Sequence, residues 1–80
     1  KDVIFMIINK DVKPNETIFY LSAIINKILK NNPLNTTNLY SELCENVRFT
    51  VDYQVFILSI NFLFLINKIM INEKGDILCI

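Results

Sequence analysis

The fold is decided by the run Tyr53-Gln54-Val55-Phe56-Ile57-Leu58-Ser59-Ile60-Asn61-Phe62-Leu63-Phe64-Leu65-Ile66 and by the segment that follows it, Ile69-Met70-Ile71-Asn72-Glu73-Lys74-Gly75-Asp76-Ile77-Leu78-Cys79-Ile80. The first run predicts a helix that is apolar on almost every side, because only Ser59 and Asn61 interrupt it after Val55. The second predicts a short β-hairpin, in which Gly75 adopts the positive φ that a tight turn requires.

Length and composition indicate a small subunit rather than a free-standing domain. The chain has 80 residues, so we expect a single domain over residues 1–80. A domain of this size buries only roughly 60% of the surface that its unfolded chain exposes. Hydrophobic residues make up 52% of the sequence with only one Gly, and two other short helices cannot cover an all-round apolar helix. The surplus apolar surface therefore predicts a protein partner.

Two helices and a short strand are expected before the apolar helix. Residues 3–8 are β-branched and aromatic and predict a strand, with a loop over residues 9–14. The first helix begins near Asn15 or Thr17 and ends near residue 30, where Asn31-Asn32-Pro33 stops it. The second begins at a cap among residues 35–37 and ends near residue 45. Its polar residues, expected to form a solvated outer face, are Asn38, Ser41, Glu42 and Glu45.

The apolar helix is expected to begin with Thr50 as its cap, with Asp52 in the first turn, and to end near Asn67. Three helices followed by a hairpin is the order of a winged helix-turn-helix. The predicted fold class is therefore mainly α with a small β-hairpin, namely three helices plus a wing and a short N-terminal strand.

A winged helix raises the hypothesis of DNA binding, because its third helix can enter the major groove. At the start of that helix only Gln54 could contact a base edge, and Asp52 would repel phosphate. Eight Lys and Arg balance eight Asp and Glu, so the chain lacks the basic excess of a nucleic-acid binder. A DNA-binding regulator remains an alternative that this charge pattern disfavours.

The apolar helix supplies the candidate residues for a protein interface. Phe56 and Tyr53 lie on different faces of the predicted helix, and both faces are not expected to be covered within one small domain. The opposing interpretation is that these side chains fill the core. The candidate interface residues are Tyr53, Phe56, Ile57, Phe62 and Phe64.

Residue types that carry chemistry are scarce. The chain has no His, and no Gly-rich loop could bind a phosphate, so we expect no catalytic residue, no cofactor and no metal site. Cys44 and Cys79 lie in apolar patterns and are predicted to be reduced and buried. The apolar run falls short of the ~20 residues that span a membrane, and no secretory signal pattern is visible, so a cytoplasmic location is expected.

Three segments resemble a known family: Pro14-Asn15-Glu16-Thr17-Ile18-Phe19-Tyr20-Leu21-Ser22, Leu39-Tyr40-Ser41-Glu42-Leu43, and the helix from Phe56 to Ile69 followed by Gly75 and a last strand. This pattern is similar to the small middle components of bacterial ABC-three-component systems. The family has a Leu-Gly-Lys-Ile-like turn after the helix, whereas this chain has Ile66-Asn67-Lys68-Ile69. Asn still tolerates the left-handed conformation of a helix end.

The resemblance implies a winged-helix adaptor that works with a large ABC or SMC-like ATPase and an effector-bearing component in anti-phage defence. The sequence analysis therefore predicts a non-catalytic protein-protein adaptor subunit that contacts nucleic acid only indirectly. The alternatives are a small DNA-binding winged-helix regulator and a winged-helix dimerisation module.

Overall fold

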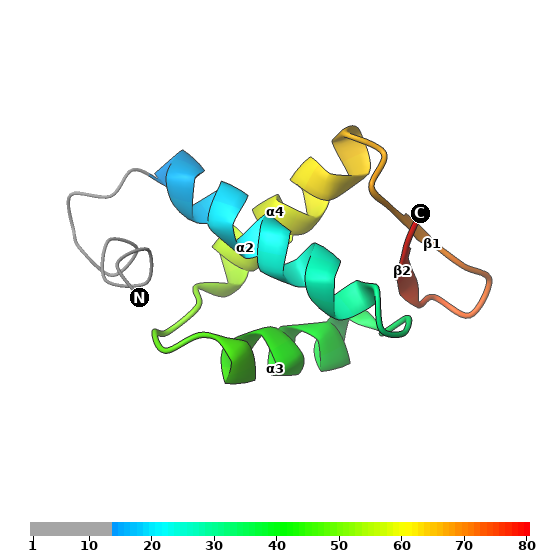
Figure 1. The fold of residues 1–80 in the computed structure, drawn as a ribbon, viewed down its shortest axis with the longest axis horizontal. Coiled ribbons are helices and arrows are strands. Elements are labelled where there is room, and N and C mark those ends of the chain that lie inside the picture. Colours follow the sequence, from blue (N-terminus) through cyan, green and yellow to red (C-terminus); the bar gives the residue numbers. More distant parts are fainter. Residues whose placement is uncertain (1–13) are drawn as a thin grey trace.

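The computed structural model describes residues 14–80, within which three helices precede a two-stranded hairpin (Figure 1). Helix α2 spans Pro14–Leu29, α3 spans Thr36–Asn46 and α4 spans Tyr53–Leu65; strands β1 and β2 span Ile69–Ile71 and Ile77–Cys79. This mainly helical, winged-helix-like arrangement confirms the predicted fold class. The strand and loop predicted before residue 14 lie outside the described residues.

Side-chain caps fix where α3 and α4 begin. Asn35 caps α3, because its Oδ1 accepts a hydrogen bond from the Asn38 N–H at 2.8 Å. Asp52 caps α4 by accepting from the Gln54 N–H at 2.9 Å. The prediction of Thr50 as the α4 cap is therefore wrong. Val51 is buried, and its carbonyl accepts a hydrogen bond from the Tyr40 hydroxyl at 2.6 Å, which holds the chain extended up to Asp52.

The C-terminal end of α4 is closed by a Schellman motif. Asn67 has φ 61°, the Lys68 N–H donates to the Leu63 carbonyl at 2.9 Å, and the Asn67 N–H donates to the Phe64 carbonyl at 3.0 Å. The left-handed conformation expected at Asn67 is confirmed. The motif turns the chain directly from α4 into β1.

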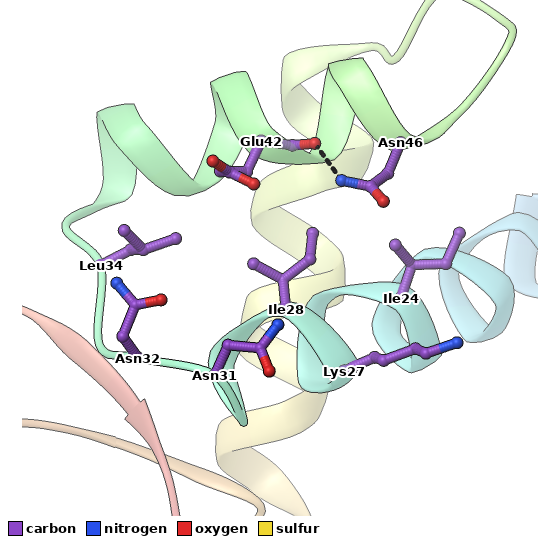
Figure 2. A pocket seen from close by; sticks show the side chains of 8 residues that line it. All are labelled: Ile24, Lys27, Ile28, Asn31, Asn32, Leu34, Glu42 and Asn46. Atoms are coloured by element: carbon purple, nitrogen blue, oxygen red, sulfur yellow. Dashed lines mark hydrogen bonds between the residues drawn. The ribbon is translucent and has the colours of Figure 1, made fainter.

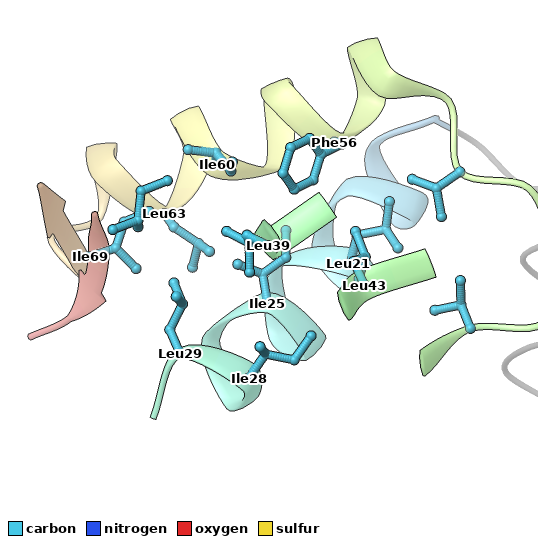
Figure 3. Close-up of a cluster of buried hydrophobic side chains, with 13 residues drawn as sticks. Leu21, Ile25, Ile28, Leu29, Leu39, Leu43, Phe56, Ile60, Leu63 and Ile69 are labelled. Atoms are coloured by element: carbon cyan, nitrogen blue, oxygen red, sulfur yellow. The ribbon is translucent and has the colours of Figure 1, made fainter. Parts of the chain in front are cut away.

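The core lies where α2 crosses α3 and α4, and the hairpin closes one end of it (Figures 1 and 3). Each helix contributes the residues of one stripe at helical spacing, and each strand contributes one isoleucine. The buried hydrophobic residues are Leu21, Ile25, Ile28, Leu29, Leu39, Leu43, Val47, Val51, Phe56, Ile60, Leu63, Ile69 and Ile77.

Two serines lie at the contact between α2 and α4. Ser22 and Ser59 are 3% and 0% exposed, so their hydroxyls need partners inside the protein. The Ser22 hydroxyl donates to the Ser59 carbonyl at 3.3 Å, and the Ser59 hydroxyl donates to the Val55 carbonyl at 2.8 Å. Their small size allows the two helices to approach closely while both hydroxyls are satisfied.

The hairpin has the register Ile69↔Cys79, Met70↔Leu78 and Ile71↔Ile77. In the turn, Asn72 Oδ1 accepts hydrogen bonds from the Lys74 and Asp76 N–H groups, both at 2.9 Å. Gly75 has φ 85°, which confirms the positive φ predicted for it.

Leu34, in the loop between α2 and α3, joins the hairpin to the helices. Its N–H donates to the Ile77 carbonyl at 3.0 Å, and its carbonyl accepts from the Ile77 N–H at 2.8 Å. This antiparallel bridge lies on the side of β2 opposite β1. The wing is therefore attached to the helical core by backbone hydrogen bonds as well as by the burial of Ile69 and Ile77.

Candidate protein-interaction surface

Helix α4 divides into a buried stripe and an apolar surface that faces outward. Phe56, Ser59, Ile60 and Leu63 form the buried stripe. At 100° per residue the opposite half of the helix carries mainly apolar side chains, which we name the α4 outer surface. Its residues are Ile57, Leu58, Phe62 and Leu65, together with Tyr53, which lies beside the buried stripe but is half exposed at the start of the helix.

The degree of exposure along this surface is high for side chains of this kind. Tyr53 and Leu58 are each 50% exposed and Leu65 is 82% exposed, whereas Ile57 and Phe62 are half-buried. Scattered exposed apolar residues are normal on proteins, whereas exposed apolar residues gathered on one helix face make that face a candidate interaction surface. The polar residues interspersed on this face are Gln54 and Asn61.

A shallow groove of about 300 Å³ lies at the N-terminal half of the α4 outer surface. Tyr53, Gln54, Ile57 and Leu58 line it, so the Gln54 amide and the Tyr53 hydroxyl are the polar groups in a mainly apolar lining. Such a lining suits an apolar side chain of a partner, with these two groups available to orient the partner by hydrogen bonding.

Tyr53 is held in place by two other aromatic rings. Its ring centroid lies 5.1 Å from that of Tyr40 and 5.5 Å from that of Phe56. Partial desolvation of Tyr40 raises the pKa of its phenol, and the neighbouring Cys44 and Asp52 raise it further. The phenol therefore keeps the proton that it donates to Val51. Tyr53 is thus supported on one side while half of its surface remains open to solvent.

A second aromatic pair lies between α2 and α4. The rings of Phe19 and Phe62 are 5.1 Å apart, and Phe19 is 52% exposed. Phe19 was not among the predicted interface residues, although the sequence shows a large aromatic residue beside the apolar stripe of α2. It extends the apolar surface from α4 onto α2.

The five candidate residues fall into four environments. Tyr53 and Ile57 lie together in the groove, and Phe62 pairs with Phe19. Phe64 is half-buried and packs against the core. Phe56 is 0% exposed, so this side chain belongs to the core and is left out of the surface, which corrects its selection as an interface residue. Leu58 and Leu65 take its place because their exposure is greater.

A second cleft, of about 290 Å³, lies between α2 and α3 (Figure 2). Ile24, Ile28 and Leu34 supply its apolar side chains. Its polar side chains are Lys27, Asn31, Asn32, Glu42 and Asn46. Two of the amides are already engaged, because Asn46 Nδ2 donates to the Glu42 carbonyl at 2.8 Å and Asn32 Nδ2 donates to the Pro33 carbonyl at 3.4 Å. The cleft offers hydrogen bonds but no nucleophile paired with a base.

Groups that could perform chemistry are sparse in the part of the chain that the structure describes. No cluster of three or more His, Cys, Asp or Glu residues that could hold a metal ion occurs in that part. Cys44 and Cys79 form no disulfide with each other and are half-buried, whereas full burial was predicted. The Cys79 thiol donates to Asn26 Oδ1 at 3.1 Å, which ties β2 to α2. No described helix is both long enough and apolar enough to cross a membrane.

The α4 surface lacks the features of a DNA-reading helix. A recognition helix needs Lys, Arg, Asn or Gln at its exposed N-terminal positions, with cations nearby for phosphate. Here Asp52 caps the helix, Gln54 is the one such residue in the first turn, and α4 contains no Lys or Arg. The exposed face of α4 is therefore suited to an apolar partner surface rather than to the major groove.

Comparison with known proteins gives one informative match. No curated protein and no solved structure matches the chain. The family model described as ABC-three component (ABC-3C) system Middle Component 6 matches residues 8–79, which is nearly the whole chain. The chain belongs to the family of ABC-three component (ABC-3C) system Middle Component 6 proteins.

Proposed function

We propose that this chain is a non-catalytic adaptor that docks onto a large ABC or SMC-like ATPase through the α4 outer surface. In the proposed assembly the adaptor links the ATPase to an effector component, and the complex acts in the bacterial cytoplasm in defence against phage. The observation that carries the proposal is the run of exposed apolar side chains on α4, the helix that would read DNA in a winged-helix regulator.

Family membership supports the same reading. A middle component of a multi-component system works with protein partners, and an adaptor needs apolar anchors in the centre of its contact surface. Tyr53, Leu58 and Phe19 are each about half exposed, and large aromatic and aliphatic side chains of this kind dominate interface energies. Because Tyr53 is already fixed by Tyr40 and Phe56, its ordering on binding costs little conformational entropy.

The adaptor role is tested by omission. The chain and the other components encoded beside it are co-expressed, with an affinity tag on the ATPase, and the eluted complexes are weighed by native mass spectrometry. We expect the ATPase, this chain and the effector to elute as one complex. Expression without this chain should release the effector from the ATPase.

Two results would overturn the proposal. The first is an ATPase and effector that bind each other equally well without this chain. The second is a chain that elutes alone and shifts DNA in a gel at moderate salt, which would favour the regulator alternative.

A further inference from the structure

Within the described residues, strand β1 is an edge strand whose three residues are all apolar. Within residues 14–80, β2 pairs with β1 on one side and with Leu34 on the other, and no strand pairs with the outer side of β1. The strand reads Ile69-Met70-Ile71. Soluble proteins usually protect such edges by keeping the strand very short, or with Lys, Pro, a bulge or a covering element. Here the strand has three residues and Lys68 precedes it. The strand itself is entirely apolar, and this leaves it able to pair with another strand.

The hydrogen-bond pattern of the hairpin shows which backbone groups this edge presents. Lys68 and Asn72 bond across to β2, since the Ile80 N–H donates to the Lys68 carbonyl and the Asn72 N–H donates to the Asp76 carbonyl. In an antiparallel ladder hydrogen-bonded pairs alternate with non-bonded pairs, so Met70 also faces β2. The N–H and C=O groups of Ile69 and Ile71 therefore point away from β2, toward the open side.

The centre of the outer face of the hairpin is apolar as well. Side chains alternate along a strand, so the face opposite the core carries Met70, Leu78 and Ile80. The polar residues Lys68, Asn72 and Asp76 lie at the ends of the same face. Met70 is 46% exposed and Ile80 is 70% exposed. An exposed antiparallel sheet normally has polar residues on its outer face, whereas strands that are apolar on both faces are covered on both.

We propose that β1 pairs with β1 of a second copy of this chain, antiparallel, across a two-fold axis at Met70. In this register Ile69 of each copy lies opposite Ile71 of the other, and these are the residues whose backbone groups are open. Both pairs exchange N–H···O=C bonds, so the two hairpins form one four-stranded sheet. Two-fold dimers of this self-complementary kind are the commonest homo-oligomers. The pairing does not depend on the adaptor role.

Charge and symmetry favour a second copy over an unrelated strand. The hairpin carries two cations, Lys68 and Lys74, and two carboxylates, Glu73 and Asp76, so two copies approach without net repulsion. The same register places Lys68 of one copy opposite Asn72 of the second copy, next to the turn that carries Glu73. Met70 lies opposite Met70, which makes the outer apolar face continuous across the axis.

The dimer is expected to dissociate on dilution, because pairing through a three-residue strand buries less surface than a standard stable interface. Sedimentation velocity of the 80-residue chain over a concentration series should show a monomer–dimer equilibrium that reaches dimer at high concentration.

Charge exchange at the axis tests the register. In the proposed dimer, residue 70 of one copy lies opposite residue 70 of the other at a non-hydrogen-bonded pair, where the two Cα atoms are about 4.5 Å apart. Met70→Lys and Met70→Glu each place two like charges at this pair, so each variant alone should be monomeric. An equimolar mixture pairs Lys with Glu and should recover the dimer. Because Met70 is half exposed in the monomer, neither variant removes a core contact, and far-UV circular dichroism should show that both fold. Ser41→Lys, on the exposed face of α3, should dimerise as the original chain does.

Three results would overturn this inference. They are a wild-type chain that stays monomeric at every concentration, Met70 variants that dimerise normally, and a mixture of the two variants that stays monomeric. The first of these would instead leave the edge open to a strand from another component.

Discussion

Replacing Leu58 by Asp should abolish docking onto the ATPase component while leaving the fold intact. Leu58 lies in the groove of the α4 outer surface and is 50% exposed. Full burial of a leucine side chain stabilises by about 1.5–3 kcal/mol, and half of this side chain is already buried within the chain. The remaining half therefore contributes about 1 kcal/mol when a partner covers it.

This estimate predicts different losses of binding affinity for two substitutions of Leu58. Leu58→Ala should weaken binding about five-fold, which corresponds to about 1 kcal/mol. Leu58→Asp adds the cost of burying an unpaired carboxylate, which is several kcal/mol, so affinity should fall more than about 100-fold. The thermal unfolding midpoint should fall by roughly 5–10 °C, because the half of the side chain that is buried within the chain contributes about 1 kcal/mol to folding and a mid-helix Asp costs about 0.5 kcal/mol more. Far-UV circular dichroism should show that the variant still folds at the assay temperature.

The assay is isothermal titration calorimetry of the purified chain against the purified ATPase component, with the melting curve of each variant recorded beside it. Ser41→Asp is the matched control, since it places the same charge on the exposed face of α3, away from the α4 outer surface. Equal affinities for the original chain and for Leu58→Asp would refute the docking surface.

Three further predictions concern stability. Phe56→Ala should lower the free energy of unfolding by about 3–5 kcal/mol in urea titrations, because Phe56 is fully buried; a loss as small as that of an exposed residue would contradict its place in the core. Asn67→Ala should cost about 1 kcal/mol in the same titrations because of the left-handed backbone, and Asn67→Gly should not. The pKa of the Tyr40 phenol is raised in the folded chain, so the folded chain holds the phenol proton more tightly than the unfolded chain does. The protonated phenol therefore contributes its full stabilisation below the ordinary pKa of 10.0. This stabilisation is lost as the pH rises through the pKa that the phenol has in the folded chain. Tyr40→Phe should destabilise the chain at neutral pH through the lost bond to Val51 and should show a smaller decline in stability above pH 10, measured by thermal melts. A decline equal to that of the original chain would contradict this.

Local signals predicted most of the described fold. Pro and Asn residues mark the loop after α2, Asn35 provides a side-chain cap, and Gly75 and Asn67 occupy the two positive-φ positions. These features depend on a few neighbouring residues, so the sequence carries them directly. The helix order and the hairpin followed from them, and with them the winged-helix-like class.

The orientation of α4 could not be predicted in the same way. Almost every position in α4 is apolar, so periodicity does not reveal which stripe is buried. Phe56 and Leu58 look alike in the sequence, but only the packing of α2 and α3 puts Phe56 inside and Leu58 outside. The start of α4 was misplaced for a related reason, because the bond from Tyr40 to Val51 is a tertiary contact that no local pattern encodes.

The most direct test of the docking surface is site-specific photo-crosslinking in the assembled system. A photoreactive amino acid is placed at Leu58 in one version of the chain and at Ser41 in another, and each is co-expressed with the other components. The account predicts that position 58 crosslinks to the ATPase component in high yield and that position 41 does not. A complex that assembles fully while position 58 crosslinks to no other component would contradict it.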